Sequence, residues 1–315
     1  MSYSFENKKY LRVEYQSATG KFGSSNKDTI ILDGYRVRAD IQRSVGFVMG
    51  SLSAKIYGLS TSDMNSMTIT QYTENYMNTN KIIITAIDGT SETVVFRGDV
   101  INSWANYSNM PDIFLQVEAQ NQFFNKSVAP PKKTCPNIVG ADVWREKISI
   151  RDSVPIDAIM LIIAEKMCLN YENRSNIEIN ISNPYLNGSP LDQLTQLHDH
   201  FDLDFYIGDD VLAIVPKGEA RIVTPQNSGE DKTPIISPFS GLIGYPTFNG
   251  YQLAMNVLFN PDIVFGGKII VDTSIPQASG EWVVQSINHR LDSETPDGFW
   301  YSEILGTRTE NAITK

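Results

Sequence analysis

The chain has 315 residues, of which 41% are hydrophobic and 20% charged, a composition typical of folded globular proteins rather than disordered ones. This length accommodates two or three domains with an ample hydrophobic core. The formal net charge of −10 argues against a general nucleic-acid-binding protein, since such proteins present basic surfaces to phosphates. We therefore expect no stable binding of DNA or RNA.

Charge is unevenly distributed along the chain. Residues 1–133 carry 14 Lys and Arg against 12 Asp and Glu, whereas the remainder carries 12 against 24. Such asymmetry bears on partners and solubility rather than on fold. The N-terminus lacks the apolar core of a signal peptide, and the longest apolar run, near Ala158–Ala164, is too short to span a bilayer. The sequence predicts a protein folded in a cytoplasm, without a membrane span.

The first 125 residues are rich in β-forming side chains. Apolar and polar residues alternate in Arg36–Gln42 and Ser51–Tyr57, as in half-buried strands. Further candidate strands lie at residues 10–15, 29–42, 81–87, 93–97 and 112–119. A short helix is expected after Ser60 or Thr61, because either hydroxyl can cap a helix and Met64 and Met67 are three positions apart. Many short, regularly spaced strands indicate a barrel or a sandwich.

A proline-rich segment then separates this region from one of different character. Residues 128–136 contain three prolines and a basic pair, which favours an extended linker. Beyond it, apolar residues at helical spacing predict a helix from Pro155 to Met167, and Ser189-Pro-Leu-Asp192 resembles the capping box of a second helix. A hairpin is expected over 205–215.

The last region returns to strands, expected near residues 253–259, 268–271, 282–288 and 299–305. The predicted fold class is therefore mainly β with an α+β insert, in which two tube-like β-barrel domains flank a small α+β domain. The predicted boundaries are 1–127 for the first barrel, 128–136 for the linker, 137–235 for the α+β domain and 236–315 for the second barrel. We hypothesise that the two β regions share a topology.

Metal-binding and redox patterns are weak. On a helix His198 and Asp202 lie at i and i+4 and could share a ligand, but His200 points elsewhere and spacing supplies no third ligand. The exposed end of an amphipathic helix is the simpler interpretation. Cys168 follows an apolar run and is interpreted as a small buried hydrophobe. Whether Cys135 and Cys168 form a disulfide is left open, and no metal or cofactor is expected.

Catalytic patterns are also absent from the sequence. No Gly-x-Ser-x-Gly elbow occurs, and Asp209-Asp210 is interpreted as an acidic hairpin turn rather than a pair of glycosidase carboxylates. Gly266-Gly267-Lys268 lacks the spacing of a phosphate-binding loop, and Gly241-x-x-Gly244 is no dinucleotide fingerprint. Both are interpreted as turns. We assign no catalytic, cofactor-binding or metal-binding residue and expect that the protein is not an enzyme.

Taken in order, several segments resemble bacteriophage baseplate hub proteins across nearly the whole chain. The early ones are Ser51–Ser60, Asp63–Asn65 and Val95–Gly98, the last followed by Trp104 and Asp112–Ala119. The middle ones are Ser182–Ser189 and Leu212–Gly218. The most specific lie in the last third: Ser237-Pro238, Gly241–Phe248, Leu258–Pro261, Phe265–Gly267, Gly280–Val284, His289 and Gly298–Trp300. These motifs are structural, so they indicate a family without indicating a site. The same architecture occurs in the hub part of type VI secretion spike proteins.

The resemblance implies a homotrimer in the virion tail baseplate, assembled in the host cytoplasm. Two barrel domains from each of three chains would form a six-barrel ring matching a six-fold tail tube. The implied partners are the tail tube or distal tube protein, the central spike protein, the tape-measure protein and other baseplate proteins. The channel would pass DNA during ejection, and we expect its lining to be neutral or acidic. Since the sequence shows no spike helix and no fused lysozyme, those functions are expected on separate chains.

Two other functions are carried as alternatives. A tail-tip cell-wall hydrolase would need a coherent acid pair or a metal cluster. A carbohydrate- or receptor-binding module at the tail periphery would bind sugars or cells as an isolated protein.

Overall fold

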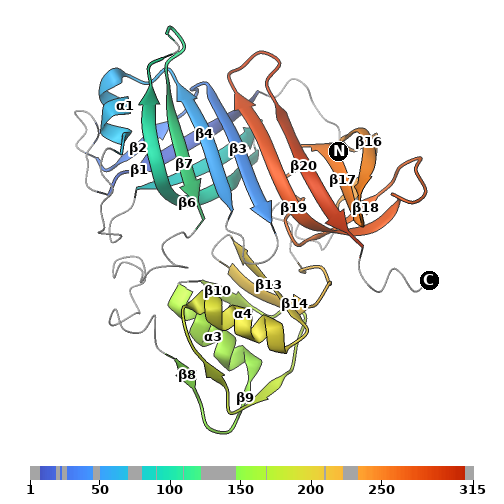
Figure 1. Cartoon of the computed structure of the whole chain (residues 1–315). Coiled ribbons are helices and arrows are strands. Elements are labelled where there is room, and N and C mark those ends of the chain that lie inside the picture. Colours follow the sequence, from blue (N-terminus) through green and yellow to red (C-terminus); the bar gives the residue numbers. More distant parts are fainter. Residues whose placement is uncertain are drawn as a thin grey trace.

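A computed structural model describes residues 8–18, 22, 27–44, 50–69, 80–89, 91–108, 110–121, 147–167, 169–208, 211–222 and 233–308. Strands predominate in this part of the chain, so the expected mainly β fold class is confirmed (Figure 1). The expected linker at 128–136, the pair Asp209-Asp210, and both Cys135 and Cys168 lie outside the described residues. The limits of the four expected segments stay predictions.

The first seven strands follow the order β2-β1-β5-β6-β7-β4-β3 across a sheet, with antiparallel neighbours. They are β1 (Lys9–Gln16), β2 (Thr29–Leu32), β3 (Val37–Ser44), β4 (Ser51–Tyr57), β5 (Lys81–Asp88), β6 (Ser91–Asn106) and β7 (Phe114–Gln120). The expectation of one continuous run over residues 29–42 is wrong. Gly34 adopts φ 75° between β2 and β3, a conformation that suits glycine and turns the chain.

The short helix expected after Ser60 is confirmed as α1 (Thr61–Met67). Ser60 is the N-cap residue, and its hydroxyl accepts a hydrogen bond from Asp63 N at 3.1 Å. Met64 and Met67 lie on the face that packs into the core of the first strands and are fully buried. The predicted spacing of these methionines therefore identified the buried face of the helix.

Both helices expected in the middle of the chain are confirmed, as α3 (Ile156–Met167) and α4 (Pro190–His200). Ser189 and Asp192 form the predicted capping box, and the predicted hairpin is formed by β13 (Leu203–Gly208) and β14 (Val211–Pro216). The remaining short strands are β8 (Ile148–Ser149), β9 (Ser153–Pro155), β10 (Asn170–Glu172), β11 (Asn180–Ser182) and β12 (Tyr185–Leu186). Residues 147–222 are called the middle module below.

The last region contains β15 (Ile235–Ile236), β16 (Leu242–Asn249), β17 (Gln252–Leu258), β18 (Lys268–Val271), β19 (Gly280–Ser293) and β20 (Trp300–Thr307). Strand β16 was not predicted, because Gly244 and Pro246 interrupt its pattern. Gly244 was interpreted as part of a turn, but it lies within β16, with φ 71°, where the pairing with β17 shifts register. Gly266 and Gly267 form a turn, as expected.

The two β regions do not form separate sheets. Strand β3 pairs with β19 in antiparallel register from Val37–Ser293 to Ser44–Ser286, which joins both regions into one 13-stranded sheet. No closed barrel forms among the residues described, so the expected pair of barrels is not confirmed. Figure 1 shows β3 and β19 side by side in the middle of the sheet.

The two regions nevertheless repeat one strand order. Strands β3, β4, β7, β6, β5 and β1 are neighbours in that order, and β16, β17, β20, β19, β18 and β15 are neighbours in the corresponding order. Neighbours are antiparallel in both sets except β15 and β18, which are parallel. An extra residue bulges from the same place in each, Ile101 of β6 opposite β7 and Gln285 of β19 opposite β20. The two regions therefore share a strand order, whereas the barrel topology expected for both is not confirmed.

The middle module lies at one end of this sheet. Tyr206 and Phe265 pack edge to face with ring centroids 6.4 Å apart, and Arg221 N donates to Gly266 O at 2.7 Å. Gly266 N in turn donates to Val284 O near the start of β19. Since β19 starts beside the module and runs along the sheet, its last residues lie at the opposite end of the sheet. Figure 1 shows the module below the sheet and the β6–β7 and β19–β20 connections above it.

Candidate assembly surface

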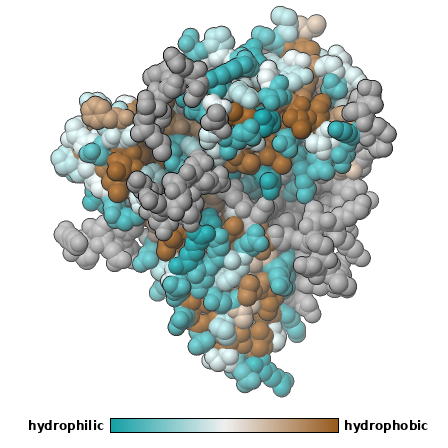
Figure 2. Space-filling view, turned by 180° about the vertical axis from the view of Figure 1, so that it is seen from behind, coloured by the Kyte–Doolittle hydropathy of each residue, from teal (hydrophilic) through white to brown (hydrophobic). Residues whose placement is uncertain are grey.

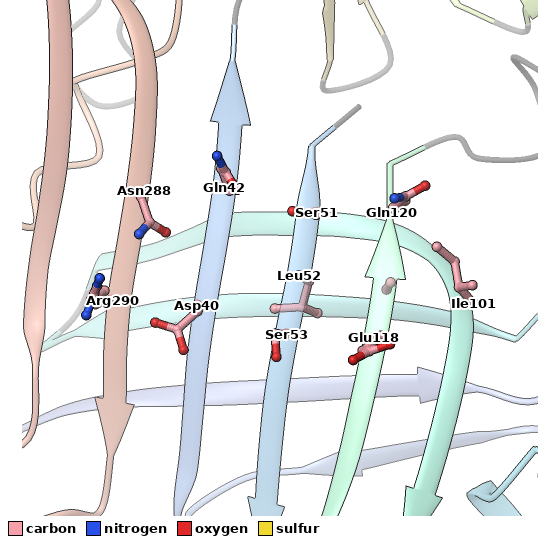
Figure 3. A pocket seen from close by; sticks show the side chains of 11 residues that line it. Asp40, Gln42, Ser51, Leu52, Ser53, Ile101, Glu118, Gln120, Asn288 and Arg290 are labelled. Atoms are coloured by element: carbon pink, nitrogen blue, oxygen red, sulfur yellow. The ribbon is translucent and has the colours of Figure 1, made fainter. Parts of the chain in front are cut away.

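One face of the joined sheet is lined by charged and uncharged polar side chains. Across β7, β4, β3 and β19, cross-strand register places Gln120, Ser51, Gln42 and Asn288 in one row and Glu118, Ser53, Asp40 and Arg290 in the next. Both rows line a hollow of about 470 Å³ (Figure 3). The alternate residues of these strands point the other way into the hydrophobic core.

Charges on this polar face are largely neutralised by ion pairs. Arg38 donates two hydrogen bonds to Asp292, at 3.1 and 3.2 Å, and Arg290 contacts Glu303 at 3.1 Å. Burial raises the pKa of Asp40, while the charges of Arg290 and Arg38 oppose that shift. Basic and acidic groups are thus intermixed rather than separated into patches.

Strand β16 forms an outer edge of the sheet, whereas its counterpart β3 lies inside the sheet. Strand β16 is the last strand on its side, and Ile243, Tyr245 and Phe248 are 42%, 74% and 49% exposed. The corresponding strand β3 is instead paired on both sides, with β4 and β19. An edge strand with exposed apolar side chains is a template for pairing with another chain.

Other apolar side chains near β16 are exposed as well. Phe239 and Tyr251 are each 97% exposed, in the turns before and after this strand. Figure 2 shows the back of the molecule, where apolar residues reach the surface over both the sheet and the middle module, between polar ones. Exposure at β16 therefore stands out because it coincides with an unpaired strand edge.

The histidines considered as ligands make hydrogen bonds within the protein. His198 Nδ1 lies 2.7 Å from Leu203 O, and His200 Nδ1 lies 2.7 Å from Gln196 O. No group of three His, Cys, Asp or Glu suited to a metal ion occurs among the described residues. Helix α4 ends at His200, so Asp202 lies beyond it and the i, i+4 spacing at 198–202 gains no support as a metal site.

The third histidine, His289, is a residue of β19, and its side chain is buried in the core. Its Nδ1 is 2.7 Å from Ser302 Oγ, and its ring packs edge to face against Phe259. Burial lowers the pKa of His289 to about 3, with a further contribution from the charge of Arg43. Its position and neutral state indicate a packing role.

The glycine motif at 266–267 serves packing as well. A Cβ on Gly266 would lie 2.5 Å from the Tyr206 ring, and Gly266 has φ 73°. The turn thus lets the middle module approach the last strands closely. No helix in the described ranges is both long and apolar enough to cross a membrane.

Solved structures with this fold are phage tail proteins and their relatives. The prophage MuSo2 43 kDa tail protein from Shewanella oneidensis matches with a TM-score of 0.58 and 10% identity, over 95% of this chain and 97% of that one. The tail protein from Neisseria meningitidis MC58 matches with 0.58 and 8%, over 95% and 96%. The E. coli c3393 protein, a type VI secretion system component described as similar to phage T4 tail proteins gp27 and gp5, matches with 0.51 and 8%, over 86% and 73%.

The joined sheet and its middle module therefore have the fold of these phage tail proteins. The chain belongs to the baseplate hub gp41 family, whose model matches residues 19–303. No curated protein sequence matches it. The family resemblance noted in the sequence is confirmed. The unpaired edge of β16 was missed by sequence reasoning, because only strand pairing reveals which strand lacks a neighbour.

Proposed function

We propose that this protein is a structural baseplate hub that forms a trimeric ring, adapts the six-fold tail tube to the three-fold central spike, and surrounds the channel for tape measure and DNA. The observation that carries the proposal is the repeated strand order, with the two repeats joined by β3 and β19. One chain then supplies two similar units side by side, and three chains supply six.

The internal junction is a template for the contact between subunits. It joins non-equivalent strands, since β3 corresponds to β16 and β19 corresponds to β6. A contact of this head-to-tail kind, repeated between chains, closes into a ring when the rotation allows. By the same rule, β16 of one subunit would pair along β6 of the next.

The edges available for this pairing support the proposal. Among the described strands β16 pairs with β17 alone, so a neighbouring chain could pair along its other edge, beside the exposed Ile243, Tyr245 and Phe248. On the side of β6 that pairs with β5, strand pairing ends at Asp99. Beyond Asp99, Val100 N donates a hydrogen bond to Asn80 O and Ile69 N donates one to Ser103 O. An obligate interface of this kind is expected to be large, with an apolar centre.

The polar face of the sheet is the proposed channel wall. Its ion pairs leave few unpaired cations, and each free Lys or Arg would add salt-dependent affinity for phosphate and slow the passage of DNA. Three basic residues face that side, Arg38, Lys55 and Arg290, against four acidic ones, Asp40, Glu118, Asp292 and Glu303. A neutral to slightly acidic lining agrees with the expectation from the sequence.

A second candidate function is hydrolysis by the hollow in this face. Asp40 and Glu118 lie on β3 and β7 with β4 between them, so their Cα atoms are about 10 Å apart. Glycosidases also use two carboxyl groups, one with a raised pKa, as burial gives Asp40. Clearing of a peptidoglycan gel by the protein, abolished in D40N and E118Q, would favour this function over the hub. The hub proposal expects no clearing.

Native mass spectrometry of the full chain, alone and with its spike protein, tests the hub proposal. Three copies per particle are expected, and one or six copies would contradict it. The alternative of a peripheral carbohydrate- or receptor-binding module predicts cell or sugar binding by the isolated protein, which the hub proposal does not. Spike, tape-measure and other baseplate proteins remain proposed partners in the virion tail, assembled in the host cytoplasm.

A further inference from the structure

The edge of β6 that faces away from β7 is occupied at one position by the residue that follows helix α1. Ile69 N donates a hydrogen bond to Ser103 O at 2.8 Å, beyond the last residue of β6 that pairs with β5. Close by, the Tyr107 hydroxyl donates to Asn65 Oδ1 of α1 at 3.0 Å. Figure 1 shows α1 at the margin of the first strands. The end of α1 therefore lies beside the part of β6 that extends past β5.

This part of β6 offers few positions for pairing with another strand. Backbone groups alternate in direction along a strand. Because Ser103 O points outward to Ile69, Ala105 also points outward, whereas Trp104 between them points to β7. From Ser103 to the end of β6 at Asn106, two residues therefore face outward, and the bond from Ile69 occupies one of them.

In the second β region the corresponding position belongs to a paired strand. Counted from the bulges in β6 and β19, Ser103 corresponds to Ile287. Ile287 lies opposite Arg43 of β3 in the antiparallel pairing that joins the two regions. Ile69 therefore holds the position on β6 that corresponds to the one held by β3 on β19.

Helix α1 is anchored in the core, whereas Ile69 is attached more weakly. Met64 and Met67 are fully buried, and Met67 O accepts a hydrogen bond from the Tyr15 hydroxyl at 3.2 Å. The Thr68 hydroxyl donates to Met64 O at 2.7 Å, which keeps this residue on the helix. Ile69 is half-buried, and within the described ranges a single backbone bond joins it to β6. That bond can open without unpacking the helix.

We infer that Ile69 guards the edge of β6 and is displaced when β16 of a second copy of this chain pairs there. This inference rests on the proposed function, which assigns that edge to β16 of the next subunit. The bond to Ser103 O must open before the neighbouring strand can use both outward-facing residues. A covered edge also resists pairing with unrelated chains. Each subunit thus carries an autoinhibitory contact that slows ring formation.

The variants I69P and I69A test the guard. Proline lacks the amide hydrogen, so I69P loses the bond to Ser103 O. Thr68 already has φ −74° and ψ 128°, the conformation favoured before a proline, so the end of α1 should be kept. I69A keeps the amide and shortens the side chain, which makes it the matched control. Each full-length protein is refolded by dilution from urea, and trimer formation is followed by mass photometry.

I69P is expected to form trimers about fivefold faster than I69A, because one hydrogen bond that competes with assembly contributes roughly that factor. Circular dichroism checks that both variants are folded. Equal rates for the two variants, or slower assembly by a folded I69P, would overturn the inference. An unmodified protein that stays monomeric would instead refute the proposed function.

Amide hydrogen exchange measures the same contact without a substitution at Ile69. The Ile69 amide is compared in the unmodified trimer and in the variant I243K/Y245K, in which charges on β16 keep the chain monomeric. Exchange is expected to be at least about tenfold faster in the trimer, because the neighbouring strand then uses Ser103 O. Equal or slower exchange in the trimer would show that Ile69 is not displaced, even if I69P does not fold.

Discussion

Arg38 and Asp292 are 254 positions apart in the chain, yet their side chains form a two-point ion pair across β3 and β19, at 3.1 and 3.2 Å. The Asp292 side chain is only 3% exposed, and Asp292 Oδ2 also accepts a hydrogen bond from Phe299 N. One carboxylate therefore connects the first β region, the last β region and the connection between β19 and β20.

Removal of this carboxylate should weaken the fold. We expect D292A to lower the free energy of unfolding by about 1–3 kcal/mol, because the half-exposed Arg38 regains water while the Phe299 amide loses its acceptor. The exposed pair of Lys268 and Glu281 offers a matched control, and K268A should change stability by less than about 1 kcal/mol. Equal effects of both variants in urea unfolding would contradict this prediction.

Charges placed on the edge of β16 should prevent the proposed ring from forming. In the double variant I243K/Y245K two lysines replace exposed apolar groups, so the isolated chain should fold with an unchanged circular dichroism spectrum. Native mass spectrometry should then report monomers. Ile31, 61% exposed on β2 at the far edge of the sheet, provides the control, and I31K should remain trimeric. The reverse result would place the interface at β2.

His289 should make stability depend on pH. Its pKa is about 3 in the folded protein against an ordinary value of 6.5, so the unfolded chain binds the additional proton between these values. Its contribution to stability is complete above about pH 6.5 and is lost as pH falls towards 3, at up to about 1.4 kcal/mol per pH unit.

The variant H289Q isolates this contribution from that of the carboxylates. Unfolding free energies of both proteins, measured at half-unit steps, should converge on acidification as the unmodified protein loses its advantage. Two parallel curves would show that His289 does not titrate differently in the folded and unfolded states.

Substitutions at two glycines distinguish the effect of a steric clash from that of backbone strain. Gly266 and Gly250 both have positive φ, 73° and 62°, but a Cβ at Gly266 would lie 2.5 Å from Tyr206, whereas nothing lies within 4 Å at Gly250. We expect G250A to destabilise by about 1 kcal/mol from strain alone and G266A by about 3 kcal/mol or more. Thermal unfolding measures both, and a larger effect at Gly250 would contradict the proposed role of the turn at 266.

Local structure was predictable where a short pattern determined it. Alternation predicted β4, and a hydroxyl cap with methionines three apart predicted α1, because these signals depend on neighbours in sequence. The shift in register at Gly244 obscured β16. The bulge at Ile101 is likewise set by the partner strand rather than by local sequence, and β6 extends well beyond the strand expected over 93–97.

The candidate surface was less predictable than the fold. Pairing between β3 and β19 joins distant segments, and periodicity shows that a strand has a buried face without showing which strand lies beside it. Only strand pairing shows that the edge of β16 is exposed and that the β6–β7 and β19–β20 connections lie at the same end of the sheet. Around His198 and His200, Nδ1 of each ring lies 2.7 Å from a backbone carbonyl oxygen, a contact that spacing in the sequence does not reveal.

The pairing of β3 with β19 also constrains when the protein can finish folding. On the ribosome β3 emerges early, but its partner is made only after the whole middle module. At about 5–20 residues per second, the edge of β3 stays open for roughly ten seconds or longer. During that interval the nascent chain exposes a strand edge of the kind that promotes aggregation. A chain truncated before β19 would keep that edge open, so truncated chains should assemble into the tail less efficiently than complete ones.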